Sequence, residues 1–194
     1  MAWIRTLNED EVTGSLRQVY EAEMGRLGFV MEATKALSIN ADLALAVDTF
    51  TGAVKLASAL SPQERRLISL IVADRLRSTY CVLVYASEVE RDLGGLDRVQ
   101  SVLRDYHSAG LSTREVAILD YAVAATIGHP SEALVTRLRS VGLDDRAIID
   151  VAVWATLRAF RSKIYEALGV RTDPFFLEQS DLVQAVAVHE GQHV

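Results

Sequence analysis

The chain is short of cysteine. Its 194 residues contain a single Cys, at position 81. A lone cysteine excludes a disulfide-stapled scaffold and fits a reducing, cytoplasmic compartment. It also excludes a dithiol redox cycle within one chain, because such a cycle needs two sulfur atoms.

Positive charge and long apolar runs are scarce as well. Lys and Arg number 20 against 26 Asp and Glu, which gives a net charge of −6. An acidic chain lacks the electrostatic footprint of a nucleic-acid-binding protein and suits an anionic membrane surface poorly. The apolar run from Leu67 to Ala73 is far shorter than the roughly 20 residues that cross a membrane. The segment Met1 to Glu11 has no apolar core of a secretory signal. We therefore expect a cytoplasmic protein without nucleic-acid or membrane partners.

Only three Pro and eleven Gly interrupt the chain. No low-complexity linker divides it, and half of its residues are apolar, which is enough for one domain with a sizeable core. We expect a single domain over residues 1–194 that ends in a tail from about residue 174 to residue 194.

Helix start signals are frequent. Asn8 with Glu11 predicts a first helix that runs to about Leu27, and Asn40 opens a segment with apolar residues at helical spacing. The sequence Ser61-Pro62-Gln63-Glu64 combines a capping Ser, a Pro at the first helical position and a Glu that reaches back to the cap. These signals predict helices throughout the first half of the chain.

The second half repeats the pattern. Ser112 to Glu115 forms another Ser-x-x-Glu signal, and Asp144-Asp145 precedes the longest apolar helix, Ala147 to Leu168. No strand-like alternation competes, so we predict an all-α fold. In both Ser-x-x-Glu signals a Leu directly precedes the Ser, as Leu60-Ser61 and as Leu111-Ser112. This repetition indicates an internal helical duplication.

Two predicted helices are apolar almost all round, namely Leu67–Leu76 and Ile148–Leu157. Such helices belong at the centre of a bundle or against a partner subunit. Because soluble monomers seldom expose large apolar patches, we expect a homo-oligomer, either a dimer or a multiple of it.

The passage from Leu60 to Gly94 holds the candidate site. Ser78 is positioned to cap a helix, which places Cys81 in the first turn, where helix N–H groups and the helix dipole lower a thiol pKa. Tyr85 and Glu88 follow at four and seven residues and share the Cys81 face of the helix within about 40°.

This passage resembles the alkylhydroperoxidase (AhpD-like) and carboxymuconolactone decarboxylase superfamily, most closely its uncharacterised peroxidase-related branch. The family pattern is Leu-Ser/Thr-x-x-Glu-Arg-Glu, followed after an interval by Cys-x-Tyr-Cys-x-x-x-His. The matching residues here are Leu60, Ser61, Glu64, Arg65, Tyr80 and Cys81, with Leu111-Ser112, Asp120-Tyr121-Ala122 and Gly142-Leu143 downstream. The resemblance covers almost the whole chain and implies an AhpD-like multihelical bundle that associates with itself.

The resemblance also implies a peroxide-reducing site, of which this chain keeps little. In the family the second Cys of the pair is oxidised, the first resolves the sulfenic acid, and a Glu and a His relay protons. In this chain Ser78 occupies the position of the resolving Cys, and Tyr85 occupies the position of the His. Arg66 occupies the position of the Glu, and Arg77 replaces the Asn that often precedes the motif. Tyr has an ordinary pKa of about 10 and Arg stays charged, so neither replaces the relay. Only Cys81 is retained, and the redox centre is degenerate.

Three functions stay open on these residues. Arg66 could hold Cys81 as a thiolate for a one-cysteine reaction with an external thiol. Alternatively, Cys81 is a small buried hydrophobe, Tyr85 a packed aromatic and Arg66 the ion-pair partner of Glu88, in a non-enzymatic binding or structural homo-oligomer. A carboxymuconolactone decarboxylase-type activity on a small organic acid would need a general base, for which Glu88 is the candidate.

Other patterns are weaker. His189 to His193 matches His-Glu-x-x-His, but it contains Gly and lies in the expected tail, so we predict neither metal nor cofactor. His107 and His129 fall near predicted helix ends, where they suit the helix dipole or solvent. The last two helices carry a group of arginines that we expect to be solvated or interfacial rather than an anion site: Arg137, Arg139, Arg158 and Arg161.

Overall fold

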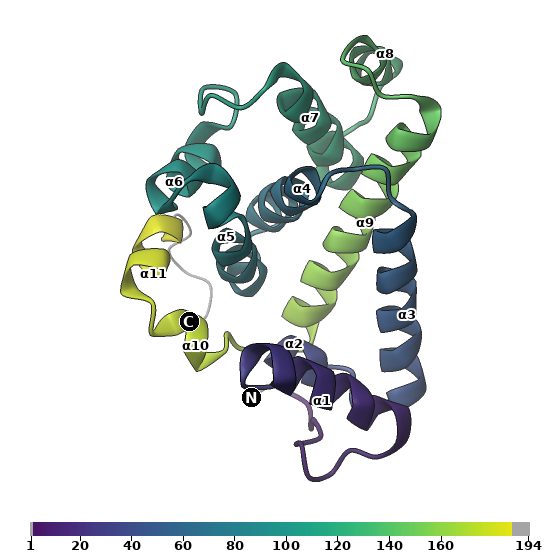
Figure 1. Cartoon of the computed structure of the whole chain (residues 1–194), viewed down its shortest axis with the longest axis vertical. Helices are drawn as coiled ribbons and strands as arrows, with labels where there is room; N and C mark the ends of the chain where they lie inside the picture. The colour runs from purple at the N-terminus through teal and green to yellow at the C-terminus, as the bar shows by residue number, and fades with distance from the viewer. Residues whose placement is uncertain (1, 188–194) are drawn as a thin grey trace.

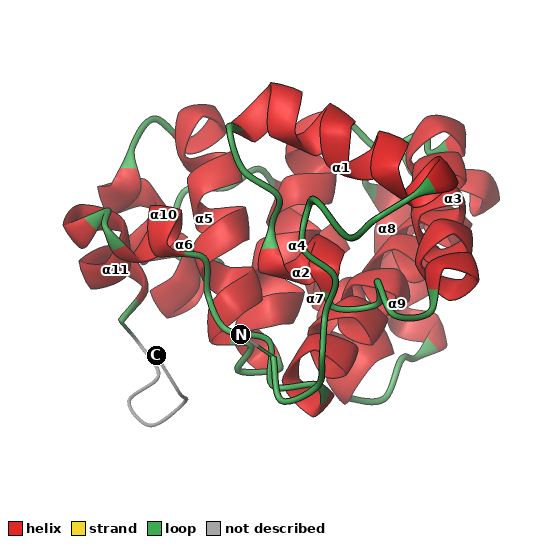
Figure 2. Ribbon diagram, turned by 90° about the horizontal axis from the view of Figure 1, so that it is seen from below, coloured by secondary structure: helices red, strands yellow, loops and turns green. Residues whose placement is uncertain are grey.

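The computed structural model describes residues 2–187, and all regular structure within this range is helical (Figures 1 and 2). The predicted all-α fold is confirmed. In chain order the helices are α1 (Gly14–Leu27), α2 (Glu32–Lys35), α3 (Ala41–Ala57), α4 (Pro62–Arg75), α5 (Thr79–Leu93), α6 (Leu96–Asp105), α7 (Thr113–Ile127), α8 (Glu132–Ser140), α9 (Asp145–Ala167), α10 (Pro174–Leu177) and α11 (Ser180–Val186).

Helix α4 lies at the centre of the bundle, with α5, α7 and α9 packed around it (Figure 1). Every residue from Leu67 to Asp74 is at most 2% exposed. This helix is apolar all round because its own chain covers it, so of the two places predicted for Leu67–Leu76 the centre of the bundle is confirmed, and the homo-oligomer stays a prediction. In α9, the residues Val151 and Trp154 also face the core, whereas Ile149 is 61% exposed.

The predicted start signals of α4 and α7 are capping boxes that lie beside each other. In each box the Ser hydroxyl accepts a hydrogen bond from the Glu N–H and the Glu carboxylate accepts one from the Ser N–H. Gln63 of α4 donates to Glu115 at 2.8 Å, and Arg114 of α7 donates to Glu64 at 2.7 Å. In both bonds, the residue before the Glu of one box donates to the Glu of the other box. This reciprocal arrangement is expected of two copies of one helical unit, but the duplication itself stays a prediction.

One predicted helix start is wrong, and one predicted cap hydrogen bond is not formed. The first helix begins at Gly14 rather than near Asn8, because the Glu11 carboxylate accepts the Asn8 N–H at 2.8 Å and closes a turn instead. Ser78 is the residue before α5, but its hydroxyl makes no cap hydrogen bond. By contrast, Asn40 caps α3 and Asp144 caps α9 as expected.

Helices α1 and α3 form an arm beside α9 (Figure 1). The arm has a small core of its own, built from Val12, Leu16, Tyr20 and Val30. No residue of α3 is fully buried, and Phe50 and Leu56 are 53% and 88% exposed. Among the described residues, no helix is both long and apolar enough to cross a membrane.

A buried carboxylate fastens the C-terminal helices to the bundle. Asp173, just before α10, is 2% exposed and accepts hydrogen bonds from the Glu32 N–H at 2.9 Å and from the Tyr80 hydroxyl at 3.0 Å. The same Tyr80 hydroxyl accepts the Ala33 N–H at 3.2 Å. This network joins α2, α5 and α10, and its α5 member, Tyr80, directly precedes the candidate cysteine.

Candidate functional site

Cys81 lies in the first turn of α5, as predicted, and is 1% exposed. A tight turn joins α4 to α5, and Arg77 within it has a φ of 58°. Side chains other than Gly seldom adopt this left-handed conformation, and Asn tolerates it best. The backbone therefore gives a physical reason for the Asn that the family pattern often has at this position.

The Cys81 thiol is enclosed by polar groups but stays in its neutral form. The hydroxyls of Ser78 and Ser162 flank it, and burial raises the thiol pKa although both hydroxyls and the guanidinium groups of Arg161 and Arg158 act to lower it. We expected the start of a helix to lower the thiol pKa. Burial outweighs this effect, because desolvation destabilises the thiolate more than the neighbouring groups stabilise it.

Tyr85 faces the same interior region, one helical turn after Cys81. Its hydroxyl accepts a hydrogen bond of 3.0 Å from Nη1 of Arg158. Both residues are 8% exposed, and the Arg158 guanidinium stacks 4.2 Å above the Trp154 ring. Burial raises the pKa of Tyr85, so its hydroxyl keeps its proton at neutral pH.

A second arginine approaches from the next turn of α9. Nε of Arg161 donates to the Tyr165 hydroxyl at 2.7 Å, and Nη1 donates to Oγ1 of Thr51 in α3 at 3.4 Å. Burial opposes the charge of Arg161, but Tyr165 and Tyr85 more than offset this, so its pKa is raised. Burial also raises the pKa of Tyr165, to about 12.

The expectation of solvated side chains is wrong for Arg158, which is buried, whereas Arg161 is half-buried and lines a pocket. The interfacial alternative stays a prediction. Arg137 and Arg139 do lie at the surface, where they pair with Asp120 and Asp145.

Arg66 is not part of the cluster around the thiol. Its guanidinium binds both carboxylate oxygens of Asp92, at 2.6 and 2.9 Å. The pairing of Arg66 with Glu88 that we considered is therefore not formed. Arg158 takes the place beside Cys81 and Tyr85 that we had assigned to Arg66.

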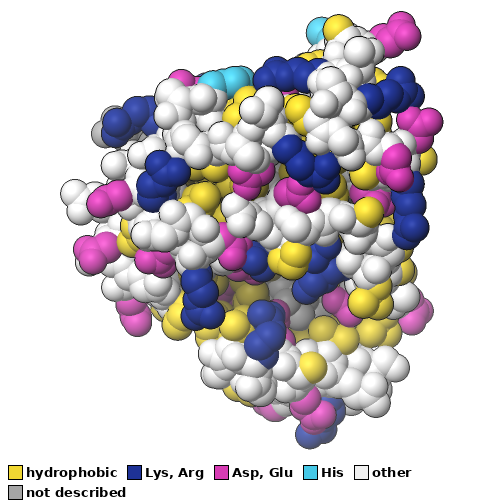
Figure 3. Space-filling view, turned by 45° about the horizontal axis from the view of Figure 1, so that its top comes forward, with side chains coloured by type: hydrophobic (Ala, Val, Ile, Leu, Met, Phe, Trp, Pro, Cys, Tyr) yellow, Lys and Arg dark blue, Asp and Glu magenta, His cyan; other side chains and the backbone are white. Residues whose placement is uncertain are grey.

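Glu88 lies at the rim of this region. Its side chain reaches solvent, yet the surrounding protein raises its pKa by desolvation against the opposing charges of Arg158 and Arg66. Arg26 at the end of α1 and Lys55 at the end of α3 act on it in the same way. A single carboxylate thus stands among cations from four helices. Figure 3 shows a hollow in the lower part of the molecule, rimmed by Lys and Arg side chains with hydrophobic ones beside them.

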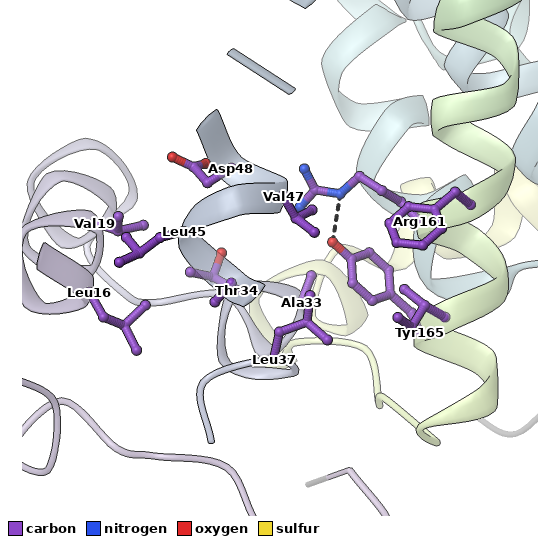
Figure 4. A pocket seen from close by; sticks show the side chains of 13 residues that line it. Leu16, Val19, Ala33, Thr34, Leu37, Leu45, Val47, Asp48, Arg161 and Tyr165 are labelled. Carbon is purple, nitrogen blue, oxygen red and sulfur yellow. Dashed lines mark hydrogen bonds between the residues drawn. The ribbon is translucent and has the colours of Figure 1, made fainter. Parts of the chain in front are cut away.

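A pocket lies between the arm and α9, and Arg161 forms its inner wall (Figure 4). Its empty volume, including the open solvent at its mouth, is about 490 Å³. Most of the lining is apolar and comes from α1, the α2 region, α3 and α9. These apolar residues are Leu16, Val19, Ala33, Leu37, Ala44, Leu45, Val47, Phe160 and Ile164.

The histidines supply no metal centre within the described range. Residues 2–187 contain no group of three or more His, Cys, Asp or Glu side chains that could hold a metal ion. His107 bonds to Asp105 and Asp120 at the surface, and His129 is exposed after α7. The His189 to His193 pattern lies outside the described residues.

Sequence reasoning missed four residues of the site, all on α9: Arg158, Arg161, Ser162 and Tyr165. A signal was present, because their spacings of three, four and seven residues place polar groups on one face of an otherwise apolar helix. Polar residues that share one face of an otherwise apolar helix are better evidence for a site than the net charge of that helix.

Comparison with known proteins supports the resemblance through structure alone. No protein-family model matches the chain, and a search of curated proteins found no match. A peroxidase-related protein of the alkylhydroperoxidase AhpD core from Ralstonia eutropha JMP134 is similar with a TM-score of 0.83 and 20% identity, over 90% of this chain and 94% of that one. For a peroxidase-related protein from Silicibacter sp. TM1040 the TM-score is 0.73 and the identity 22%, over 88% and 93% of the two chains.

A debrominase has the same fold. Bmp8, in a variant with alanine in place of a cysteine and in complex with 2,3,4-tribromopyrrole, is similar with a TM-score of 0.79 and 17% identity, over 94% of this chain and 97% of that one. Together these likenesses show that the chain has the AhpD-like fold.

Proposed function

We propose that this chain, which has the AhpD-like fold, belongs to the AhpD-like and carboxymuconolactone decarboxylase superfamily and is a peroxidase-related protein limited to one-cysteine chemistry at Cys81. The observation that supports this most directly is the setting of the thiol. Cys81 is the only sulfur nucleophile in the chain, and it lies among Ser78, Tyr85 and two buried arginines where the family places its reacting Cys.

The proposed reaction reduces a hydroperoxide by two electrons. The Cys81 sulfur attacks the terminal oxygen of ROOH, the O–O bond breaks, and the thiol proton goes to the departing alkoxide, which leaves ROH and a Cys81 sulfenic acid. A low-molecular-weight thiol then releases water and forms a mixed disulfide, which a second such thiol reduces. An external thiol is needed because Ser78 cannot form an intrachain disulfide.

The neighbours of Cys81 suit this chemistry in different ways. Arg158 and Arg161 favour the thiolate once a substrate displaces solvent, because both lower the thiol pKa. Tyr85 keeps its proton, so its hydroxyl is able to donate toward an oxygen that gains negative charge while Arg158 holds it in position. Because burial keeps the resting thiol neutral, we expect turnover to be slow.

The test is direct detection of the sulfenic acid. The protein is treated with cumene hydroperoxide in the presence of dimedone, and the intact mass is measured for the wild type and for Cys81→Ala. We expect one dimedone adduct on the wild type and none on the variant. A wild-type thiol that stays reduced under excess hydroperoxide would refute the one-cysteine reaction.

In that case the non-enzymatic alternative gains support from one observation, the 1% exposure of Cys81. A buried, neutral thiol packs as a small hydrophobe and gives no activity. The expected signature is resistance of the folded protein to alkylation by iodoacetamide, with full alkylation once urea unfolds it.

The decarboxylase-type alternative depends on Glu88. A raised carboxyl pKa brings this group closer to the working range of a general base, and cations from four helices suit an organic acid. Under this alternative the lactone substrate is decarboxylated by the wild type but not by Glu88→Gln. Activity that survives this substitution would exclude Glu88 as the base.

We also propose that the chain works in the cytoplasm as a homo-oligomer. Exposed apolar side chains are a feature of α3 rather than of the central helix, since Phe50 and Leu56 remain 53% and 88% exposed. A contact between two copies through α3 would remove this surface from water.

A further inference from the structure

Within the described residues, two arginines on successive turns of α9 make no hydrogen bond to a carboxylate, although the charge of Glu88 interacts with that of Arg158. Among residues 2–187, the hydrogen-bond partners of Arg158 and Arg161 are all neutral: the hydroxyls of Tyr85, Tyr165 and Thr51. Burying a charge is costly unless it is paired, and proteins usually provide the counter-charge from their own side chains. Two such groups on successive turns of one helix indicate that the counter-charge comes from outside the chain.

An unused donor points in the same direction. Nε of Arg158 has no hydrogen-bond acceptor among the described residues, although Arg158 is only 8% exposed. Buried polar atoms without partners are rare in native proteins. A cluster rich in donors is complementary to a ligand group that only accepts hydrogen bonds.

The pocket beside this cluster determines what else the ligand carries. Figure 4 shows that the terminal nitrogens of Arg161 extend from α9 toward Val47 of α3, while Tyr165 holds its Nε. The remaining walls are largely aliphatic. Asp48 lines the mouth on the α3 side, and its carboxylate points away from Arg161 in Figure 4. One cation at the base of an apolar pocket suits an apolar molecule with a single anionic end.

We propose that this pocket binds a small apolar carboxylic acid as its anion, with the carboxylate held by Arg161 and the apolar body held by the arm. A planar carboxylate matches the two-pronged donor face of a guanidinium. Inorganic phosphate would leave the aliphatic walls unused. The proposal deepens the proposed function and rests on it only for the location of the site, because binding requires no reaction of Cys81.

Trp154 makes the binding measurable. Its ring stacks against Arg158, and only one other Trp, Trp3, is present in the chain. Benzoate is titrated into the full-length protein while tryptophan fluorescence is recorded, with benzamide as the uncharged counterpart of the same shape. We expect benzoate to bind at least about ten-fold more tightly than benzamide, which corresponds to about 1.4 kcal/mol.

Variants assign the binding to the arginines. Arg161→Gln should weaken benzoate binding by about ten-fold or more, and Arg158→Gln should weaken it less, because only Arg161 lines the pocket. Lys163→Gln is the matched control, because it removes a positive charge from the same helix at an exposed position. It should bind benzoate like the wild type. If Arg158→Gln does not fold, Arg161→Gln and the benzamide comparison still decide the question.

Three results would overturn the proposal: equal affinity for benzoate and benzamide, wild-type affinity in a folded Arg161→Gln variant, or displacement of benzoate by sulfate at equal concentration. The same titration on Cys81→Ala separates this proposal from the proposed function. Benzoate binding without any dimedone adduct on the wild type refutes only the reaction. An adduct without benzoate binding refutes only the ligand class.

Discussion

Replacing Tyr85 by Phe tests the central feature of the site, the bond between α5 and α9. The substitution keeps the ring and its stacking with Arg158 but removes the hydroxyl that accepts Nη1 at 3.0 Å. Because both residues are 8% exposed, solvent cannot easily replace the lost acceptor. Hydrogen bonds to a charged group contribute about 1.5–3 kcal/mol, so we expect the free energy of unfolding to fall by that amount.

The loss is measured by urea unfolding, followed by tryptophan fluorescence and by far-ultraviolet circular dichroism. For a chain of this length, the loss corresponds to a decrease in Tm of about 3–12 °C. Tyr121→Phe is the matched control, because the Tyr121 hydroxyl makes no hydrogen bond among the described residues. Its stability should be nearly that of the wild type.

A double-mutant cycle with Arg158→Met isolates the pair. If the hydrogen bond is formed, the double variant loses clearly less stability than the sum of the two single losses. Additive losses, or a Tyr85→Phe variant as stable as Tyr121→Phe, would show that Arg158 and Tyr85 are not bonded in solution, and the description of the site would then be wrong.

Three further outcomes are expected. Ser78→Cys should form a disulfide with Cys81, seen as a mass decrease of two hydrogens, but should give little dithiol-dependent peroxidase turnover because the proton relay is still absent; rapid turnover would contradict this. Burial raises the pKa of Asp173, so the folded chain holds that proton more tightly than the unfolded chain, and the free energy of unfolding should fall as pH rises from 3.8 through the raised value. Asp173→Asn should remove this part of the pH dependence. If the free energies of unfolding of the wild type and of Asp173→Asn differ by the same amount at every pH in this range, the reasoning is wrong. In sedimentation velocity the wild type should form an oligomer that Phe50→Asp disrupts, whereas a wild type that sediments as a single chain would exclude self-association through α3.

Local signals were sufficient for most of the architecture. The boxes at Ser61 and Ser112 and the caps at Asn40 and Asp144 predicted where helices start, because a cap satisfies backbone N–H groups within its own few residues. Asn8 failed for the same local reason, since its partner Glu11 closes a turn without a helix behind it. Cys81 was placed correctly in the first turn of α5 because helix phase follows directly from sequence spacing.

The site beyond Cys81 depended on contacts between distant segments. A basic residue on an apolar helix is equally compatible with solvent, a subunit contact or a buried pocket. Only the tertiary contacts of α9 placed Arg158 against Tyr85 of α5 and Arg161 against Thr51 of α3. Tertiary packing likewise determined that Arg66 forms its ion pair with Asp92. The thiol pKa shows the difference most clearly: the sequence indicated the helix start that lowers it, but the depth of burial, which comes from the whole bundle, raises it.

The amino-acid sequence by itself determined that the chain is helical, that it has one thiol and that it lacks a resolving cysteine, because these properties belong to residues or to their nearest neighbours. The tertiary structure alone decided that this thiol is neutral and that two arginines hydrogen-bonded to neutral groups lie near it. Burial and electrostatic pairing arise between segments far apart in the chain, so no local pattern specifies them.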